Sequence, residues 1–246
     1  MLILAVDTST RTGSAALLRD SQVLAEISGY EETPYSTRLF RDVAVLQDRA
    51  NFRLDQIDVF AVATGPGSFT GLRVGLTAVK AWAEVHGKPI AAISGLEAIA
   101  AASLVGETLM MGEAPSASNV CFLAPFLDAR RGQIFGAIYR RIAGDPMGLT
   151  LASDESILSP DEFLELVKEK SGHPIQLISP TPDVLPSTRI REILQDVPIV
   201  QVSAALAPAI GQLGFERAKR GELVDSIQLD ANYVRRSDAE RAWKDG

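Results

Sequence analysis

The sequence predicts an α/β fold of two domains, of which the second is reduced. Three short strand-like runs at 2–7, 14–19 and 23–28 come first, and strands then alternate with helices. This order is typical of a mixed sheet in which parallel strands extend an antiparallel hairpin. A strand, an aspartate, a turn and a second strand return at 122–140 and repeat the opening of the chain. We therefore expect a duplicated domain.

Apolar periodicity predicts the elements of the first domain. Leu39, Val43 and Leu46 recur at helical spacing in a segment that begins near Ser36. A glycine-rich loop at 64–75 then separates an apolar strand from an apolar helix. In chain order we expect a helix at 36–50, a strand at 59–63, a helix at 69–86, a strand at 89–93 and a helix capped by Ser94 and Glu97.

The second domain has fewer regular elements. Residues 106–119 are small and polar with Gly and Pro among them, which is typical of a hinge or an exposed loop. Residues 141–202 contain seven prolines and two recognisable helices, at 160–171 and 187–195. A last helix at 203–220 has Pro208 in its first turns, where it would kink the helix, and ends at Gly221. The expected domains are 1–105 joined by helix 203–220, then 106–202, then a tail at 221–246.

Composition limits the kind of partner that this chain can bind alone. Its 246 residues are 46% hydrophobic and carry a formal net charge of −7. Because Lys and Arg supply most of the affinity for phosphate backbones, such an acidic chain is not expected to bind nucleic acid by itself. The sequence has no signal-peptide pattern and no run of about 18 uncharged apolar residues, so we expect a soluble, cytoplasmic protein without a membrane span.

The sequence offers few candidate residues for a metal site or for nucleophilic catalysis. The two histidines, His86 and His173, lie 87 positions apart, and Cys121 is the single cysteine. A conventional zinc site is therefore not expected, and we expect no cofactor. No Ser/His/Asp set is apparent either, which disfavours a peptidase.

The loop TGPGSFTGLRVG at 64–75 admits several interpretations. It lacks the lysine of a Walker loop, since Leu72 follows Gly71, and Thr70 stands where a Rossmann turn needs its third glycine. A generic anion site stays open, because amides at a helix N-terminus attract phosphate. The alternative is that these glycines only shape a strand-to-helix turn.

The helices at 36–50 and 69–86 carry apolar residues on more than one face. One face of each can lie on the sheet, and the other needs cover from a partner chain or from the rest of the same domain. Gly71 and Gly75 would also let another helix approach closely. The candidate partner-interface residues are Leu39, Phe40, Val43, Leu46, Phe69, Gly71, Leu72, Gly75, Leu76 and Val79.

Four motifs together resemble the TsaB (YeaZ) family. They are ILAVDTS at 3–9, GPGSFTGLRVG at 65–75, SGLEAIA at 94–100 and LDARRGQIF at 127–135. The resemblance implies two ribonuclease-H-like domains of the actin/Hsp70/sugar-kinase (ASKHA) superfamily. Tyr35 stands where the family often has histidine, and Ala231 stands where it commonly has proline.

The resemblance implies a part in forming N6-threonylcarbamoyladenosine at position 37 of tRNA. In such systems the TsaD paralogue performs the transfer with a metal held by paired histidines, and TsaE, an ATPase, joins the complex. This chain lacks the histidine pair, so we expect a non-catalytic scaffold whose partner surface is the helix pair 36–50 and 69–86. When alone it is expected to form a homodimer, and it is expected to meet tRNA only through the complex.

The alternative function is a catalytic nucleotide-dependent phosphotransferase of the same superfamily. Asp7 would then help to hold a metal–phosphate group, and Thr8 and Ser9 would donate hydrogen bonds to phosphate. Asp128 would face that group from the second domain.

Overall fold

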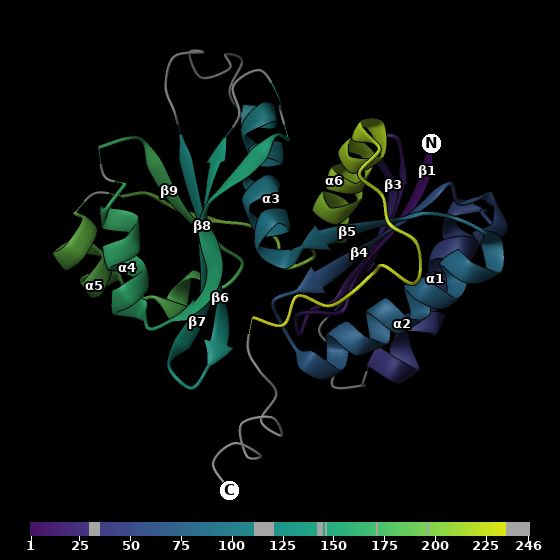
Figure 1. The fold of residues 1–246 in the computed structure, drawn as a ribbon, viewed down its shortest axis with the longest axis horizontal. Coiled ribbons are helices and arrows are strands. Elements are labelled where there is room, and N and C mark those ends of the chain that lie inside the picture. The colour runs from purple at the N-terminus through teal and green to yellow at the C-terminus, as the bar shows by residue number, and fades with distance from the viewer. Residues whose placement is uncertain are drawn as a thin grey trace, which may run out of the picture. The chain divides into compact units, whose positions relative to one another are not determined.

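The computed structural model describes residues 1–29, 35–110, 121–141, 145, 147–170, 172–195 and 197–234. The chain divides into two compact units. The first unit comprises Met1–Gly95 and Ala205–Gly246, and the second comprises Leu96–Ala204. Figure 1 shows one mixed sheet in each unit.

The first unit contains the predicted mixed sheet. Its strands lie in the order β3-β2-β1-β4-β5, with β1–β2 and β2–β3 antiparallel and β1–β4 and β4–β5 parallel. Helices supply the crossovers that parallel strands require. In chain order the strands are β1 (Leu2–Asp7), β2 (Ser14–Arg19), β3 (Gln22–Ser28), β4 (Val59–Gly65) and β5 (Ile90–Ser94), and a short 3-10 helix (Leu54–Gln56) precedes β4.

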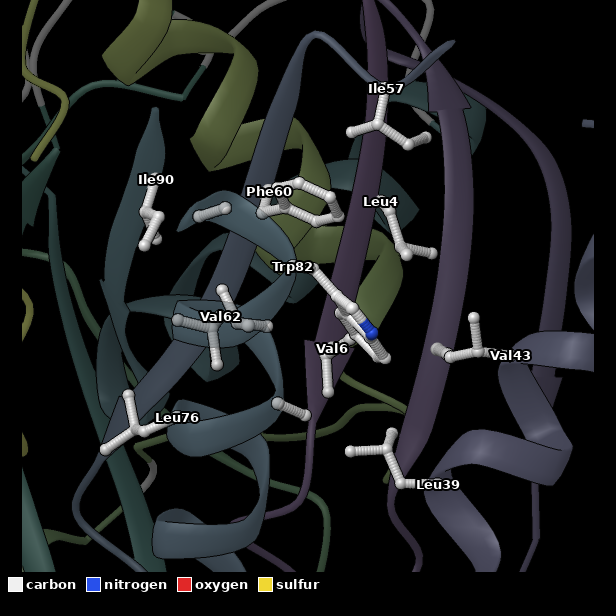
Figure 2. Packing of buried hydrophobic residues seen from close by; sticks show 14 of the residues in the cluster. Leu4, Val6, Leu39, Val43, Ile57, Phe60, Val62, Leu76, Trp82 and Ile90 are labelled. Atoms are coloured by element: carbon white, nitrogen blue, oxygen red, sulfur yellow. The ribbon is translucent and has the colours of Figure 1, made fainter. Parts of the chain in front are cut away.

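Two helices, α1 (Tyr35–Ala50) and α2 (Phe69–His86), cover one face of this sheet. Alternate residues of the central strands, such as Leu4 and Val62, point toward them. Trp82 of α2 lies in the middle of this core beside Val6, and Val43 of α1 approaches from the side (Figure 2). The helix predicted at 69–86 is therefore confirmed, and the helix predicted from Ser36 begins one residue earlier.

The opposite face of the first sheet packs against α6 (Ala207–Arg220). Two glycines of α6 make this possible, because a Cβ on Gly211 would meet Leu18 at 2.2 Å and one on Gly214 would meet Ala61 at 2.9 Å. The helix begins at Ala207, not at Ser203, so Pro208 falls in the first turn. A first-turn proline replaces an amide that has no helical partner, so the predicted kink is not needed. Gly221 ends the helix in the left-handed conformation, as predicted.

The second unit repeats the topology of the first. Its sheet order is β10-β9-β6-β7-β8, which matches β5-β4-β1-β2-β3 strand for strand. The predicted duplication is thus present in all five strands, and the reduction lies in the helices that follow β8 and β9. Its elements are β6 (Phe122–Arg130), β7 (Gln133–Arg141), β8 (Leu149–Leu158), α4 (Pro160–Lys168), β9 (Ile175–Ser179), a 3-10 helix (Pro182–Val184), α5 (Ser187–Leu194) and β10 (Ile199–Gln201).

The boundary region differs from the sequence expectation. The helix α3 (Gly95–Met110) begins directly after Ser94 and continues through residues 106–110, where the composition predicts a hinge or an exposed loop. The first unit gives way to the second at the start of this helix, between Gly95 and Leu96. Residues 111–119 of the predicted loop lie outside the described residues.

The chain after α6 runs along the first unit outside any named helix or strand, and we call this segment the strap (222–234). Val224 exchanges two backbone hydrogen bonds with Ile90 of β5, at 2.8 and 2.9 Å. Farther along, Leu229 is 1% exposed in the core cluster, and the Asn232 amide donates to Thr64 O at 2.8 Å. These residues therefore belong to the packed structure of the first unit, whereas the sequence suggests a tail from 221 onward. Within the described residues, no helix is both long enough and apolar enough to cross a membrane.

Candidate functional site

The turn after β1 holds three of the four residues proposed for nucleotide binding. Asp7 is 0% exposed, and its Oδ1 accepts hydrogen bonds from the Ser9 amide at 2.8 Å and from Ser9 Oγ at 2.6 Å. Thr8 and Ser9 are buried as well. All three polar side chains thus bond within the chain, so Asp7 would have to move before it could reach a metal–phosphate group.

The second carboxylate oxygen of Asp7 is the unusual group in this turn. Asp7 Oδ2 is buried and has no hydrogen-bond partner among the residues that the structure describes. Burial raises the pKa of the Asp7 carboxyl, and the hydrogen bonds from Ser9 offset this only in part. This environment favours the neutral acid, which is a poor ligand for a cation.

The glycines of the 64–75 loop let the N-terminus of α2 lie directly on this turn. A Cβ on Gly67 would meet Ser9 O at 2.5 Å, and one on Gly71 would meet Thr8 O at 2.0 Å. The Ser68 amide donates to Ser9 O at 2.7 Å, and Ser68 caps the helix by accepting from the Gly71 amide. The loop is therefore a packing device between α2 and the β1–β2 turn.

This contact corrects the interpretation of Gly71 and Gly75. The sequence suggests that they admit a helix of another chain, but both are buried against Thr8 of the same unit. At Gly75 an added Cβ would lie 2.3 Å from Thr8 Oγ1. Glycine spacing reveals a close approach, and it does not reveal which segment approaches.

The first residues of α1 hold the other side of the β1–β2 turn. Arg38 is buried and donates to Gly29 O at 2.8 Å, to Thr12 O at 3.0 Å and to Asp42 Oδ2 at 2.8 Å. The Tyr35 hydroxyl lies 2.6 Å from Thr10 O, and burial raises the pKa of Tyr35 to about 12. Tyr35 thus ties α1 to the turn.

Asp128 occupies the matching position in the second unit but a different environment. It is exposed, and its Oδ1 accepts from the Arg130 amide at 2.6 Å. The equivalent bond in the first unit joins Asp7 and Ser9. Both aspartates therefore shape the hairpin turn that follows their strand, each in its own unit.

Most of the candidate interface residues are covered by their own chain. Leu39, Val43 and Leu46 of α1 pack on the sheet, as do Leu72, Leu76 and Val79 of α2, and none of the six is more than 6% exposed. With Gly71 and Gly75, eight of the ten candidates are buried. The reasoning from surplus apolar surface therefore fails for these eight, since the sheet and the neighbouring helix already cover them.

A smaller apolar surface does remain on the outside of α1 and α2, which we call the α1–α2 patch (Phe40, Ala44, Val74, Ala81, Val85). Phe40 is 56% exposed and packs edge-on against Trp82, with ring centroids 5.7 Å apart. Val85 is 78% exposed, Ala44 and Ala81 are exposed, and Val74 is half-buried. Of these five residues only Phe40 was among the sequence candidates. Helical spacing indicates the three on α2, because Val74, Ala81 and Val85 recur along one side of that helix.

Phe69, the other surface candidate, lies at the strap. Its ring is 4.9 Å from that of Tyr233, and the Arg73 guanidinium lies 3.8 Å above the Phe69 ring. Arg73 Nε also donates to the Tyr233 hydroxyl at 3.3 Å. Phe69 is therefore half-covered by the strap, a contact that the sequence did not predict.

No group of three or more His, Cys, Asp or Glu side chains is placed to hold a metal ion in the described part of the chain. His86 lies at the end of α2 in the first unit, and His173 precedes β9 in the second. The His173 ring packs against Phe122 at a centroid distance of 5.6 Å, which gives it a structural contact.

Comparison with known proteins assigns the family. The tRNA threonylcarbamoyladenosine biosynthesis protein TsaB of Bacillus subtilis is 31% identical over 99% of this chain and 98% of its own length. The chain belongs to the TsaB family. TsaB of Escherichia coli is 29% identical over 70% of this chain and 68% of its own length. The family model of TsaD, described as tRNA N6-adenosine threonylcarbamoyltransferase, matches residues 32–228.

The TsaB family assignment agrees with the fold. YeaZ of Pseudomonas aeruginosa superposes with a TM-score of 0.69 and 23% identity, covering 94% of this chain and 99% of that protein. The predicted fold class of two α/β domains, each with a mixed five-stranded sheet, is therefore confirmed. The TsaB relatives are named as proteins of tRNA threonylcarbamoyladenosine biosynthesis, which places the family in that pathway.

Proposed function

We propose that this chain is a non-catalytic partner of the TsaD transferase in forming N6-threonylcarbamoyladenosine at tRNA position 37. Family membership supports the pathway, and the match of the TsaD family model to residues 32–228 supports a paralogous relation to the transferase. The observation that carries the partner role is the α1–α2 patch. It exposes a phenylalanine and a valine beside a buried tryptophan on two neighbouring helices.

The turn at Asp7 supports the non-catalytic part of the proposal. A catalytic carboxylate in a phosphotransferase must reach solvent-borne substrate, but Asp7 is fully buried and bonded to Ser9. Thr8 and Ser9 donate their hydroxyl hydrogens to Gly71 O and Asp7. Their arrangement serves to fix the helix that carries half of the patch.

The other expected partners follow from the same proposal. TsaE would join the complex of this chain with TsaD, and tRNA would meet the complex and not this chain alone, in keeping with a net charge of −7. In the absence of TsaD, the α1–α2 patch would pair with its copy in a homodimer. The complex would act in the cytoplasm.

Co-elution with TsaD tests the interface. We expect the double variant Phe40→Glu/Val85→Arg to lose the complex, because both side chains are exposed in the free chain and charges there would be desolvated by a partner. Leu151→Arg on β8, a residue 50% exposed in the second unit, is the matched control and should co-elute normally. Leu72 and Leu76 are unsuitable for this test, since an arginine at either buried position would unfold the first unit.

Two results would contradict the proposal separately. A complex that survives the double variant with unchanged affinity would remove the α1–α2 patch as the interface. Loss of tRNA modification by an Asp7→Asn variant that still folds and still binds TsaD would contradict the non-catalytic role.

A further inference from the structure

The second unit carries a groove between α5 and β10 that the proposed function does not use. Its volume is about 320 Å³, at the lower end of the size of ligand pockets. The groove lies beside β10, which is an edge strand of the second sheet. It is lined by Ser187, Ile190, Arg191, Gln195, Val197 and Ile199.

The strand beside the groove has an unpaired backbone edge. β10 is the last strand of its sheet and pairs only with β9, in parallel register, among the described strands. Pro198 O accepts from the Leu177 amide at 2.9 Å, and the Val202 amide donates to Ser179 O at 3.2 Å, so Pro198 and Val202 face β9. Backbone groups alternate in direction along a strand, so the N–H and C=O groups of Ile199 and Gln201 point away from the sheet.

The matching edge of the first unit shows how this fold covers such a strand. β5 occupies the position of β10 in the repeated topology, and there the strap adds an antiparallel bridge between Ile90 and Val224. Ile199 and Gln201 have no corresponding backbone partner among the described residues. A strand edge of this kind is a template for pairing with another extended segment.

The side chains around the groove define what such a segment would carry. The Arg191 guanidinium makes no hydrogen bond or ion pair within the described part of the chain, whereas its neighbour Arg189 pairs with Asp161 at 2.7 Å and with Glu192. Ile199 is 38% exposed and lies beside the buried Ile190. The groove therefore presents an apolar wall and one uncompensated guanidinium, which suits a carboxylate.

From these observations we infer that the α5–β10 groove binds an extended segment of a partner protein as an added antiparallel strand. The segment exchanges backbone hydrogen bonds with Ile199 and Gln201, places an apolar side chain against Ile190 and Ile199, and directs an Asp or Glu side chain to Arg191. This docking site lies in the second unit and does not depend on the α1–α2 patch.

Selection of displayed random linear peptides on the full chain tests the inference. We expect the enriched sequences to combine apolar residues at alternate positions with an acidic residue. A synthetic peptide of the consensus should slow the exchange of the Ile199 and Gln201 amide protons by about tenfold or more, as a new strand partner would. Failure to enrich any peptide, or protection of amides elsewhere on the chain, would overturn the inference.

Two variants separate backbone pairing from charge recognition. Gln201→Pro removes an outward N–H that the sheet does not use. It should therefore leave the melting temperature unchanged and lower the affinity for the consensus peptide by about tenfold or more. Arg191→Glu should lower the affinity for the acidic peptide by a similar factor. It should raise the affinity for a peptide in which lysine replaces the Asp or Glu. Arg140→Glu, an exposed charge reversal on β7, is the control and should bind as the parent does. Equal binding by all three variants would show that the groove is not the site.

Discussion

Thr8 Oγ1 donates a hydrogen bond to Gly71 O at 2.7 Å, and this bond joins the turn after β1 to the first turn of α2. Both residues are buried, and the Cα of Gly71 lies so close to the Thr8 carbonyl that no side chain fits between them. The position of α2 on the sheet is therefore set by the backbone of the turn. Because Phe40 rests on Trp82, the same contact also positions the α1–α2 patch.

Replacing Gly71 by alanine should destabilise the first unit by about 3 kcal/mol or more, since the new Cβ would lie 2.0 Å from Thr8 O and backbone cannot easily move aside. Urea unfolding followed by circular dichroism measures the change. Gly29→Ala is the control, because nothing lies within 4 Å of a Cβ there. A Gly71→Ala variant as stable as Gly29→Ala would show that α2 is free to shift from the turn.

Gly75→Ala should behave differently, because its Cβ would meet the side chain of Thr8 and not its backbone. Thr8 Oγ1 would stand 2.3 Å from the new Cβ, whereas the next Thr8 atoms stand at 3.5 Å. Thr8→Ala alone should cost about 1 kcal/mol for the lost hydrogen bond. In the double variant the clash disappears, so a double-mutant cycle should give a favourable coupling of about 1 kcal/mol or more. Additive losses in the cycle would mean that Gly75 is constrained by something other than the hydroxyl.

The buried carboxyl of Asp7 should make stability depend on pH. Burial raises its pKa in the folded state above the ordinary value of 3.8, so the folded protein binds this proton more strongly than the unfolded chain does. The stabilisation from this group is then fully present below pH 3.8 and is lost as the pH rises through the raised folded-state pKa. Asp7→Asn keeps the acceptor for Ser9 and carries no charge.

The free energy of unfolding of Asp7→Asn and of the parent is measured in urea at a series of pH values. The value for Asp7→Asn minus the value for the parent should increase as the pH rises from acid to neutral. Asp128→Asn provides the comparison, because the equivalent side chain in the second unit is exposed. A difference between Asp7→Asn and the parent that stays constant with pH would indicate that Asp7 titrates alike in both states.

The sequence predicted the strands and helices well, because their order and apolar spacing are local properties. It could not tell what covers the apolar faces of α1 and α2. Leu72 and Val79 pack on the parent sheet, whereas Trp82 packs both against Phe60 of the sheet and against Phe40 of α1. A helix wheel contains no information on that second neighbour. The eight buried candidates were therefore assigned to an interface that only Phe40 and Phe69 can reach from the surface.

Asp7 shows a second limit of the sequence. A carboxylate and two hydroxyls at the end of a strand are equally suited to phosphate and to a self-contained turn. The difference lies in Gly67 and Gly71, which bring the α2 N-terminus onto these residues and bury them. That close approach joins residues about 60 positions apart in the chain, so local sequence patterns do not reveal it.

The strap offers a matched pair of aliphatic residues two positions apart, and they test whether it belongs to the core. Leu229 is 1% exposed within the core cluster of the first unit, whereas Ile227 is 88% exposed. Leu229→Ala should lower the free energy of unfolding by about 2–4 kcal/mol, as expected for a buried leucine, and Ile227→Ala should change it by less than about 0.5 kcal/mol. Equal, small effects of both substitutions in urea unfolding would mean that the strap detaches without disturbing the core. The bridge of Val224 to β5 would then be an accessory contact. It would no longer support, by analogy, the addition of a strand at β10.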